Sequence, residues 1–440
     1  MHTITVKLKQ HTPLLHFQHE QYGATLRASD VKPRLDKYIL SELSDCDKAN
    51  GKTNGWIKTK EKRSWLDYKM SIVSSGTIEE FMFSSDLSDV VVNTIKECGI
   101  NLINESPFFA QREEDKIVAT KEDWNIIGKK GIIDTGNNGI VVYLRMKDNE
   151  LANKLLEHLT SFFVLNNFGT RQDKGFGSFL PISIQEDETE IRNTEPTSDD
   201  IERCFKSKFR FVYKKELSIT DEQDRFTVIF NTIKEDYQKL KSGKQNKDSE
   251  LTKYLRTGDS NGTMRMEDQY FKAEIEKRLE AHPQYQIYSI EKKASGENQT
   301  QSNLEYVYAR ALLGLAEQYE YSLYQRNNSH NGKREKANDA TAVVKVLKDK
   351  RIERFQSPIC FKVINNTIYI VGNNVEGILG NSISFNYYIK VNNNLSPNPL
   401  DNGSLNIPSS FDLEKFMKYA MNPKKDNSLN YKSIETKKTP

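Results

Sequence analysis

The segment from Gly169 to Phe179 places three glycines, two cations and two aromatic residues between a stretch with helical spacing and a stretch with strand spacing. The apolar stripe of the preceding helix consists of Leu151, Leu155, Leu156, Leu159, Phe162 and Phe163. Glycine tolerates positive φ angles and lets backbone N–H groups approach a ligand, because no Cβ stands in the way. Arg171 and Lys174 add positive charge. The segment therefore predicts a loop that lies against phosphates; the alternative is a helix C-cap followed by a tight turn.

The spacing differs from the two common glycine motifs of nucleotide-binding proteins. A mononucleotide loop needs Gly-Lys followed by Ser or Thr at the start of a helix, and a dinucleotide fingerprint needs a strand before the loop and a helix after it. Here the helix comes first, and the strand Ser178–Ile184 follows. Neither motif describes this loop.

Length and composition favour a large protein of two domains. A chain of 440 residues exceeds the size at which one hydrophobic core suffices. No apolar run approaches the roughly 18 residues that span a bilayer, and the first residues lack a signal-peptide core, so we expect a cytoplasmic protein without a membrane partner. The cysteines, Cys46, Cys98, Cys204 and Cys360, lie far apart and form no paired spacing. We therefore expect no disulfide framework, no metal site and no cofactor.

Charge is unevenly distributed although the net charge is only +3. Residues 186–203 are strongly acidic and are interpreted as an exposed linker. Residues 326–354 carry nine Lys or Arg against four Asp or Glu, and the stretch from Lys415 to the end carries seven lysines against two acids. Either could face a polyanion, and residues 426–440 are interpreted as a basic tail. A solvated surface, or for the tail a disordered segment, is the alternative.

The first 185 residues show six elements in a recognisable order. Strands are expected at Thr3–Gln10, Trp65–Ser75, Gly139–Met146 and Ser178–Ile184. One helix is expected to begin at Ser29 as its N-cap, with Pro33 in the first turn, and another at Glu150–Asn166. This order, β-α-β-β-α-β, is the ferredoxin-like order. Residues from about 76 to 138 would form a large insertion between the central strands.

A second set of elements follows the acidic stretch. Strands are expected at Lys208–Lys214, Ser357–Val363, Thr367–Val371 and Ser382–Val391, and helices at Arg225–Leu240, Arg265–Ala281, Leu304–Tyr324 and Phe411–Ala420. A second, degenerate ferredoxin-like domain over residues 204–425, with a helical insertion, fits this set. No sequence motif repeats between the two halves, so the repeat would be structural.

Two segments together resemble the RAMP superfamily of CRISPR-associated proteins. Gly169–Phe179 is similar to the glycine-rich, cation-bearing loop that precedes the fourth strand in that superfamily, and Leu26–Tyr38 resembles the entry to the first helix in subunits of type III (Cmr or Csm) effector complexes. The chain departs from the pattern at Pro33, where the family usually has glycine. The resemblance implies an α+β fold of two ferredoxin-like (RRM-like, RAMP) domains with large insertions. It also implies an RNA-binding subunit of a type III antiviral ribonucleoprotein, with crRNA, possibly target RNA, and other effector subunits as partners.

RNA held by such a subunit would be gripped through phosphates and 2′-hydroxyls, which calls for cations and backbone amides. The predicted RNA-binding residues are Arg27, Ser29, Lys32, Arg34, Gly169, Arg171, Lys174, Gly175, Phe176 and Gly177. Phe176, with Phe179, could stack on bases, or both could anchor the glycine turn in the core.

A group of histidines after the first strand leaves an enzymatic alternative open. His16 or His19 could act as general base and acid in metal-independent RNA cleavage, which would make the protein a crRNA-processing endoribonuclease. Together with His11 the two could also bind a metal, although Glu20 is the only carboxylate nearby. Otherwise these histidines contact RNA or lie in a loop, and no residue is assigned a catalytic role.

Overall fold

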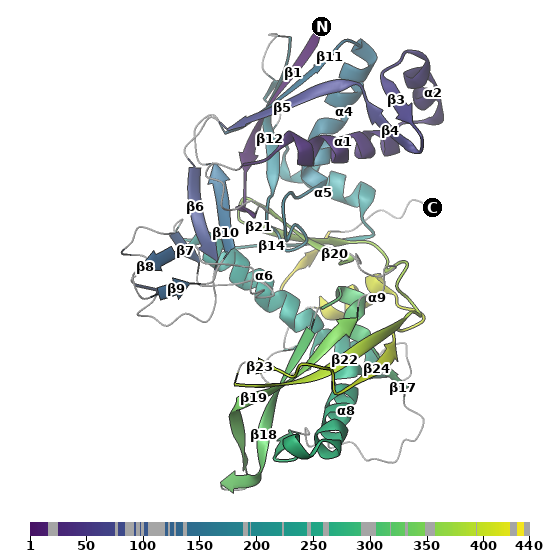
Figure 1. Cartoon of the computed structure of the whole chain (residues 1–440). Coiled ribbons are helices and arrows are strands. Elements are labelled where there is room, and N and C mark those ends of the chain that lie inside the picture. Colours follow the sequence, from purple (N-terminus) through teal and green to yellow (C-terminus); the bar gives the residue numbers. More distant parts are fainter. Residues whose placement is uncertain are drawn as a thin grey trace. The chain divides into compact units, whose positions relative to one another are not determined.

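The computed structural model describes residues 1–15, 25–74, 78–83, 92–93, 97, 101–103, 119–121, 124–126, 129–134, 139–187, 192–193, 195–221, 224–243, 248–257, 264–291, 305–316, 318–330, 333–347, 357–392, 394–422 and 429–434. The chain divides into two compact units (Figure 1). Unit 1 comprises Met1–Glu235, Ile359–Gly372 and Asn430–Pro440, and unit 2 comprises Asp236–Pro358 and Asn373–Leu429. No helix among the described residues is long and apolar enough to cross a membrane.

The first sheet of unit 1 contains the four strands expected in the first 185 residues. These are β1 (His2–Gln10), β5 (Tyr68–Ser74), β11 (Ile140–Met146) and β12 (Phe179–Glu186). They lie in the order β12-β1-β11-β5 with antiparallel neighbours, and β13 (Arg192–Asn193) pairs with β12 at the edge. The alternation that predicts β1 arises because Ile4, Val6 and Leu8 are fully buried on one face.

The two expected helices, α1 (Ala28–Glu42) and α4 (Asn149–Leu165), pack on that face (Figure 1). Asp148 caps α4, since its side chain accepts a hydrogen bond from the Leu151 amide at 2.9 Å. Between α1 and β5 the chain forms α2 (Asp45–Thr53) and the hairpin of β3 (Ile57–Lys60) and β4 (Arg63–Leu66).

The region expected as an insertion contributes a second sheet of unit 1. Its strands are β2 (Leu14–Leu15), β10 (Lys129–Asp134), β6 (Ile78–Phe83) and β7 (Asn101–Ile103), in that order, and a separate hairpin joins β8 (Ala119–Lys121) to β9 (Trp124–Ile126). The contribution of β2 shows that the chain directly after β1 belongs to this sheet.

The third sheet of unit 1 is built from distant parts of the sequence. Its order is β20 (Ile359–Ile364), β21 (Thr367–Gly372), β14 (Phe211–Glu216) and β25 (Lys432–Ser433), with antiparallel neighbours throughout. The strand β25 lies within residues 426–440, so this stretch is not simply a tail. Likewise, the expected linker 186–203 contains the end of β12, β13 and the start of α5 (Ser198–Lys208), which Thr197 and Asp200 begin with a capping box.

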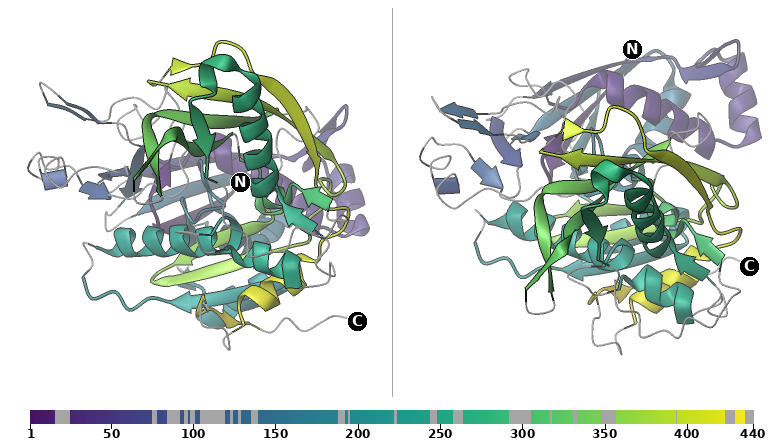
Figure 2. Two further views of the ribbon diagram at one scale, coloured as in Figure 1. Left: turned by 90° about the horizontal axis from the view of Figure 1, so that it is seen from below. Right: turned by 60° about the horizontal axis from the view of Figure 1, so that its bottom comes forward.

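Unit 2 is organised around an eight-stranded sheet. Along it lie β15 (Met264–Met266), β17 (Glu305–Val307), β24 (Asp401–Asn406), β22 (Ser382–Val391), β19 (Lys333–Leu347), β18 (Gln318–His330) and β16 (Tyr288–Ile290), and β23 (Asn394–Leu395) pairs with β22. The helical elements are α6 (Arg225–Lys241), which begins in unit 1, α7 (Glu250–Thr257), α8 (Glu267–Ala281), η1 (Pro283–Tyr285), η2 (Ala309–Leu313) and α9 (Leu413–Ala420). The helix α8 lies beside the sheet in both views of Figure 2, and its Phe271 ring is 4.8 Å from that of Phe385 in β22.

The helix predicted at Leu304–Tyr324 is wrong. The chain there forms β17, the short 3-10 helix η2 and the first part of β18. In β18, Tyr321 and Leu323 are buried while Glu320 is exposed, which is the period of a strand. Pairing with β19 therefore overrides the helical preference suggested by composition. The insertion in the second half of the chain is mainly a sheet, and only partly helical.

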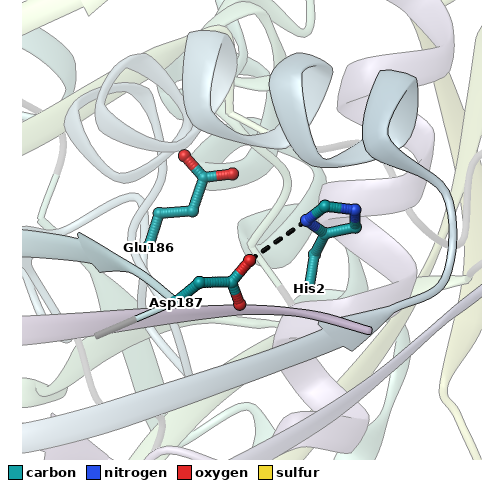
Figure 3. Close-up of side chains that lie close together, drawn as sticks. All are labelled: His2, Glu186 and Asp187. Carbon is teal, nitrogen blue, oxygen red and sulfur yellow. Dashed lines mark hydrogen bonds and ion pairs between the residues drawn. The ribbon is translucent and has the colours of Figure 1, made fainter. Parts of the chain in front are cut away.

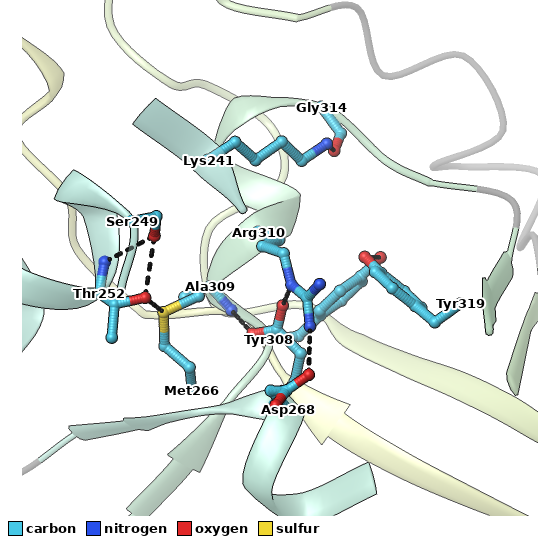
Figure 4. A network of polar contacts seen from close by, with 11 residues as sticks. Lys241, Ser249, Thr252, Met266, Asp268, Tyr308, Ala309, Arg310, Gly314 and Tyr319 are labelled. Carbon is cyan, nitrogen blue, oxygen red and sulfur yellow. Dashed lines mark hydrogen bonds and ion pairs between the residues drawn. The ribbon is translucent and has the colours of Figure 1, made fainter. Parts of the chain in front are cut away.

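A buried polar network holds η2 in place (Figure 4). The guanidinium of Arg310 pairs with the fully buried Glu267, whose other oxygen accepts the Ala309 amide at 3.0 Å. The ring of Tyr319 lies under Arg310, 4.5 Å from the guanidinium carbon to the ring centroid, and its hydroxyl is 2.7 Å from that of Tyr308. The charge of Arg310 is thus neutralised inside unit 2, and the network is structural.

Candidate nucleic-acid interface

The glycine loop has the left-handed backbone that its sequence predicts. Gly169, Gly175 and Gly177 have φ angles of 80°, 85° and 67°. A Cβ on Gly177 would lie 1.9 Å from the carbonyl oxygen of Phe168, and one on Gly169 would lie 2.4 Å from that of Leu15. At Gly175 the nearest atom would be Ile233 Cδ1, at 2.9 Å. The close packing of the chain on itself therefore requires these glycines.

Several amides of the loop already donate to the protein. The hydrogen bonds are Thr170 N to Leu15 O at 2.8 Å, Lys174 N to Arg171 O at 2.9 Å, Gly177 N to Pro13 O at 3.0 Å and Ser178 N to Thr12 Oγ1 at 3.0 Å. The sequence predicts that the loop amides point toward an anion. These four amides instead donate to acceptors within the protein. The loop instead joins the β1–β2 connection to the end of α4.

Two predicted RNA contacts of the loop lie in the core. Lys174 is 4% exposed, and its Nζ lies 2.7 Å from Asp173 Oδ2. Phe176 is fully buried and stacks on Phe230 of α6, with ring centroids 4.1 Å apart, and Phe83 meets it edge-on. In this structure Lys174 cannot reach a phosphate and Phe176 cannot stack on a base, because both side chains are covered. Phe179 is fully buried as well.

Lys32 and Arg34 both make contacts within unit 1. Lys32 Nζ donates to Asp36 Oδ2 at 2.8 Å and to Leu66 O at 3.1 Å, and it lies over the Tyr68 ring. Arg34 donates to Asn167 O at 2.7 Å and to Asn166 Oδ1 at 2.9 Å, and burial lowers the pKa of its guanidinium. Arg34 therefore joins the second turn of α1 to the residues that begin the glycine loop.

The remaining predicted residues are partly or fully exposed. Arg27, not Ser29, is the N-cap of α1, and no side chain caps this helix end. Ser29 lies exposed in the first turn, while Arg27 is half-buried. Arg171 is also half-buried and has a positive φ of 55°. The helix start and the loop are thus brought to one region of unit 1 through Arg34, but the cations there are fewer than expected.

A buried lysine that the sequence analysis missed closes the end of α4. Lys362 of β20 is 2% exposed, and its Nζ donates to Phe163 O at 2.9 Å and Asn166 O at 2.7 Å. These carbonyls have no partner within the helix, so the ammonium satisfies them. Burial, with a smaller contribution from the nearby charge of Arg34, lowers the pKa of Lys362 to about 7. The signal in the sequence is a single lysine within the apolar run Ile359–Ile364.

One group of side chains in the described part of the chain has a geometry that could ligate a cation. The ligand atoms of His2, Glu186 and Asp187 all lie within 4.8 Å of one another (Figure 3). However, Asp187 accepts hydrogen bonds from the Thr3 amide at 2.6 Å and pairs with His2 Nδ1 at 3.1 Å. These contacts account for the cluster without an ion.

Other predicted features are only partly described. His16 and His19 lie outside the described residues, so the cleavage and metal alternatives that use them have no geometry here. In the basic stretch 326–354, Arg326 lies 2.9 Å from Glu276 and 3.4 Å from Glu280. Arg326 therefore faces protein.

Two family models match the chain, the Cmr1 N-terminal domain over residues 1–244 and the Cmr1 C-terminal domain over residues 246–439. No curated protein matches it. Among solved structures it is similar to a chain of the "Cryo-EM structure of the Type III-B Cmr-beta bound to cognate target RNA", with 10% identity and a TM-score of 0.26. That similarity covers 42% of this chain and 60% of the other chain, so it spans less than two thirds of the relative. At this level of similarity nothing about function follows from it.

Proposed function

The chain belongs to the Cmr1 family of type III CRISPR effector subunits, and from this premise we propose that it is a non-catalytic subunit that binds RNA. The observation that carries the proposal is the pair of Cmr1 domain models, which together account for residues 1–244 and 246–439. The RNA would be crRNA, with target RNA and other effector subunits as further partners.

The strand orders of unit 1 support two ferredoxin-like domains. Numbered along the chain, β1, β5, β11 and β12 lie in the spatial order 4-1-3-2, with α1 and α4 between them in sequence. The strands β14, β20, β21 and β25 repeat the order 4-1-3-2 in the third sheet. We therefore propose that residues 1–185 form the first RAMP domain and that a second, degenerate domain begins near residue 204 and extends to β25.

The proposed RNA contacts on the first domain are Arg27 and Ser29 at the start of α1 and Arg171 in the glycine loop. Arg34 supports this placement, because its hydrogen bonds to Asn166 and Asn167 tie α1 to the loop. Positive charge at the start of a helix suits the RNA backbone, which is recognised without regard to sequence. The glycines would act indirectly, by fixing the backbone that presents Arg171.

The test is RNA binding by fluorescence anisotropy over a series of salt concentrations. The double variant Arg27→Gln/Arg171→Gln should weaken binding to all sequences and reduce the slope of log K against log salt by about one to two units. Lys37→Gln, which removes one exposed charge elsewhere on α1, is the matched control and should leave the slope nearly unchanged. An unchanged slope in the double variant would remove these residues from the interface.

An RNA cleavage assay tests whether the protein lacks catalytic activity. Repeat RNA incubated with the protein in EDTA should remain intact. A site-specific product that disappears in His16→Ala or His19→Ala would contradict the proposal and support the endoribonuclease alternative. Absence of any RNA affinity at physiological salt would contradict the binding function itself.

A further inference from the structure

Unit 1 contains a polar cavity that none of the predicted RNA contacts lines. Its volume is about 510 Å³, within the range of small-molecule sites. It lies where the end of β1, the end of β14, the start of α6 and the β20–β21 turn meet, and its lining residues are Lys9, Gln10, His11, Glu216, Leu217, Arg225, Asn365, Asn366 and Thr367. We call it the His11 pocket.

The charges of the pocket favour an anion. The guanidinium of Arg225 is positioned by Asn365 O, 2.8 Å from Nη2, and by Asn366 Oδ1, 3.0 Å from Nε. Lys9 is half exposed and lies 3.9 Å from Glu195. Glu216 is the one acid of the lining, and its carboxylate lies 3.7 Å from Lys214. The lining therefore carries two cations and one carboxylate, and that carboxylate already has Lys214 as a cationic neighbour.

His11 contributes a buried donor. It is 1% exposed, and its Nδ1 accepts a hydrogen bond from the Asn365 amide at 3.1 Å. Burial, with the charges of Lys9, Lys362 and Arg225, lowers the pKa of His11 to about 3, so the ring is neutral at neutral pH. Because Nδ1 is an acceptor, the proton of the neutral ring is on Nε2. That Nε2–H has no hydrogen-bond partner among the described residues, which is unfavourable for a buried donor.

We propose that the His11 pocket binds the phosphate group of a nucleotide, with Arg225 and Lys9 as its counter-charges and His11 Nε2–H as a hydrogen-bond donor. The volume leaves room for the sugar and base beside the phosphate. The phosphate belongs either to a free nucleotide or to the end of an RNA, and only the second source rests on the proposed function. A phosphate at this position would also connect β1 with the β20–β21 turn.

Isothermal titration of the full-length protein with uridine 5′-monophosphate and with uridine tests the phosphate requirement. Uridine 5′-monophosphate should bind and uridine should not. Lys9→Gln and Arg225→Gln should each weaken binding roughly tenfold, the effect of losing one charge-assisted hydrogen bond. Lys7→Gln, two residues away on the same strand and outside the pocket lining, should bind as the wild type does. If Arg225→Gln does not fold, Lys9→Gln still tests the proposal, because the Lys9 side chain is half exposed and its replacement should leave the fold intact.

Single-stranded oligouridine with and without a 5′-phosphate distinguishes the two sources. Preference for the phosphorylated RNA, lost in Lys9→Gln but retained in Lys7→Gln, assigns the pocket to an RNA end. Binding of uridine 5′-monophosphate without such a preference assigns it to a free nucleotide. If wild type, Lys9→Gln and Lys7→Gln bind all of these ligands equally well, or bind no phosphorylated ligand, the pocket proposal is overturned. Binding of uridine 5′-monophosphate that Lys9→Gln and Arg225→Gln leave unchanged overturns the pocket proposal alone. If uridine 5′-monophosphate binds at the pocket but the protein binds no RNA, only the proposed function is contradicted.

Discussion

His11 shows how burial of one side chain makes the stability of unit 1 depend on pH. Its pKa is about 3 in the folded protein, compared with 6.5 for an ordinary histidine, because burial and three nearby cations oppose its protonation. Between pH 6.5 and about 3 the unfolded chain binds the proton and the folded chain does not. The contribution of His11 to the free energy of unfolding is therefore present above pH 6.5 and is lost as the pH falls through this window.

We predict that His11→Asn makes the free energy of unfolding fall less steeply between pH 6.5 and pH 4 than it does in the wild type. Urea unfolding at a series of pH values measures this. Equal slopes for His11→Asn and the wild type would refute the argument.

At the scale of an element, the glycine loop depends on contacts as well as on backbone conformation. Gly177 and Gly377 have similar φ angles, 67° and 73°, but a Cβ at Gly177 would lie 1.9 Å from Phe168 O, whereas nothing lies within 4 Å of one at Gly377. An alanine at Gly377 therefore measures the cost of backbone strain alone, whereas an alanine at Gly177 measures strain together with a steric clash.

We predict that Gly377→Ala lowers the free energy of unfolding by about 1 kcal/mol, the cost of a left-handed residue with a side chain. Gly177→Ala should cost at least about 3 kcal/mol, because Phe168 or the loop must also move. Urea unfolding monitored by circular dichroism measures both. Equal costs would show that the Phe168 contact relaxes without penalty.

At the scale of the whole molecule, the folded units do not follow the order of the sequence. Unit 1 takes β20 and β21 from Ile359–Gly372, although the N-terminal family match ends at residue 244. A fragment of residues 1–244 would lose both strands and would expose part of the cluster formed by Val164, Leu180, Val212, Tyr369 and Val371. It would also lose Lys362, which satisfies the last carbonyls of α4.

We predict that the fragment 1–244 is less stable to unfolding than unit 1 in the full chain by at least about 3 kcal/mol, since burying each large apolar side chain contributes about 1.5–3 kcal/mol. Thermal unfolding of the fragment, alone and co-expressed with residues 245–440, measures this. Co-expression should restore part of the stability. A fragment that unfolds at the same temperature as the full chain would show that β20 and β21 contribute little.

The sequence alone placed six elements of the first 185 residues, the four strands of the first sheet and the helices α1 and α4, because their apolar periodicity is a local property. The alternation of Ile4, Val6 and Leu8 marks β1, and the stripe from Leu151 to Phe163 marks α4, wherever these elements pack. The positive φ angles of Gly169, Gly175 and Gly177 were likewise predictable from residue type. The family followed from the same segments, and the family models confirm it.

What faces the loop and the strand ends was decided only by the tertiary structure. Lys174 and Phe176 look like RNA contacts in the sequence, but Asp173 and Phe230 cover them once the chain folds. The His11 pocket and the Lys362 cap each join residues more than a hundred positions apart, and no local pattern records such a meeting. Residues 318–324 form a strand and not the predicted helix because they pair with β19, which is also a contact that no local pattern contains. Periodicity reports that a side chain is buried, whereas only the folded chain determines what it is buried against.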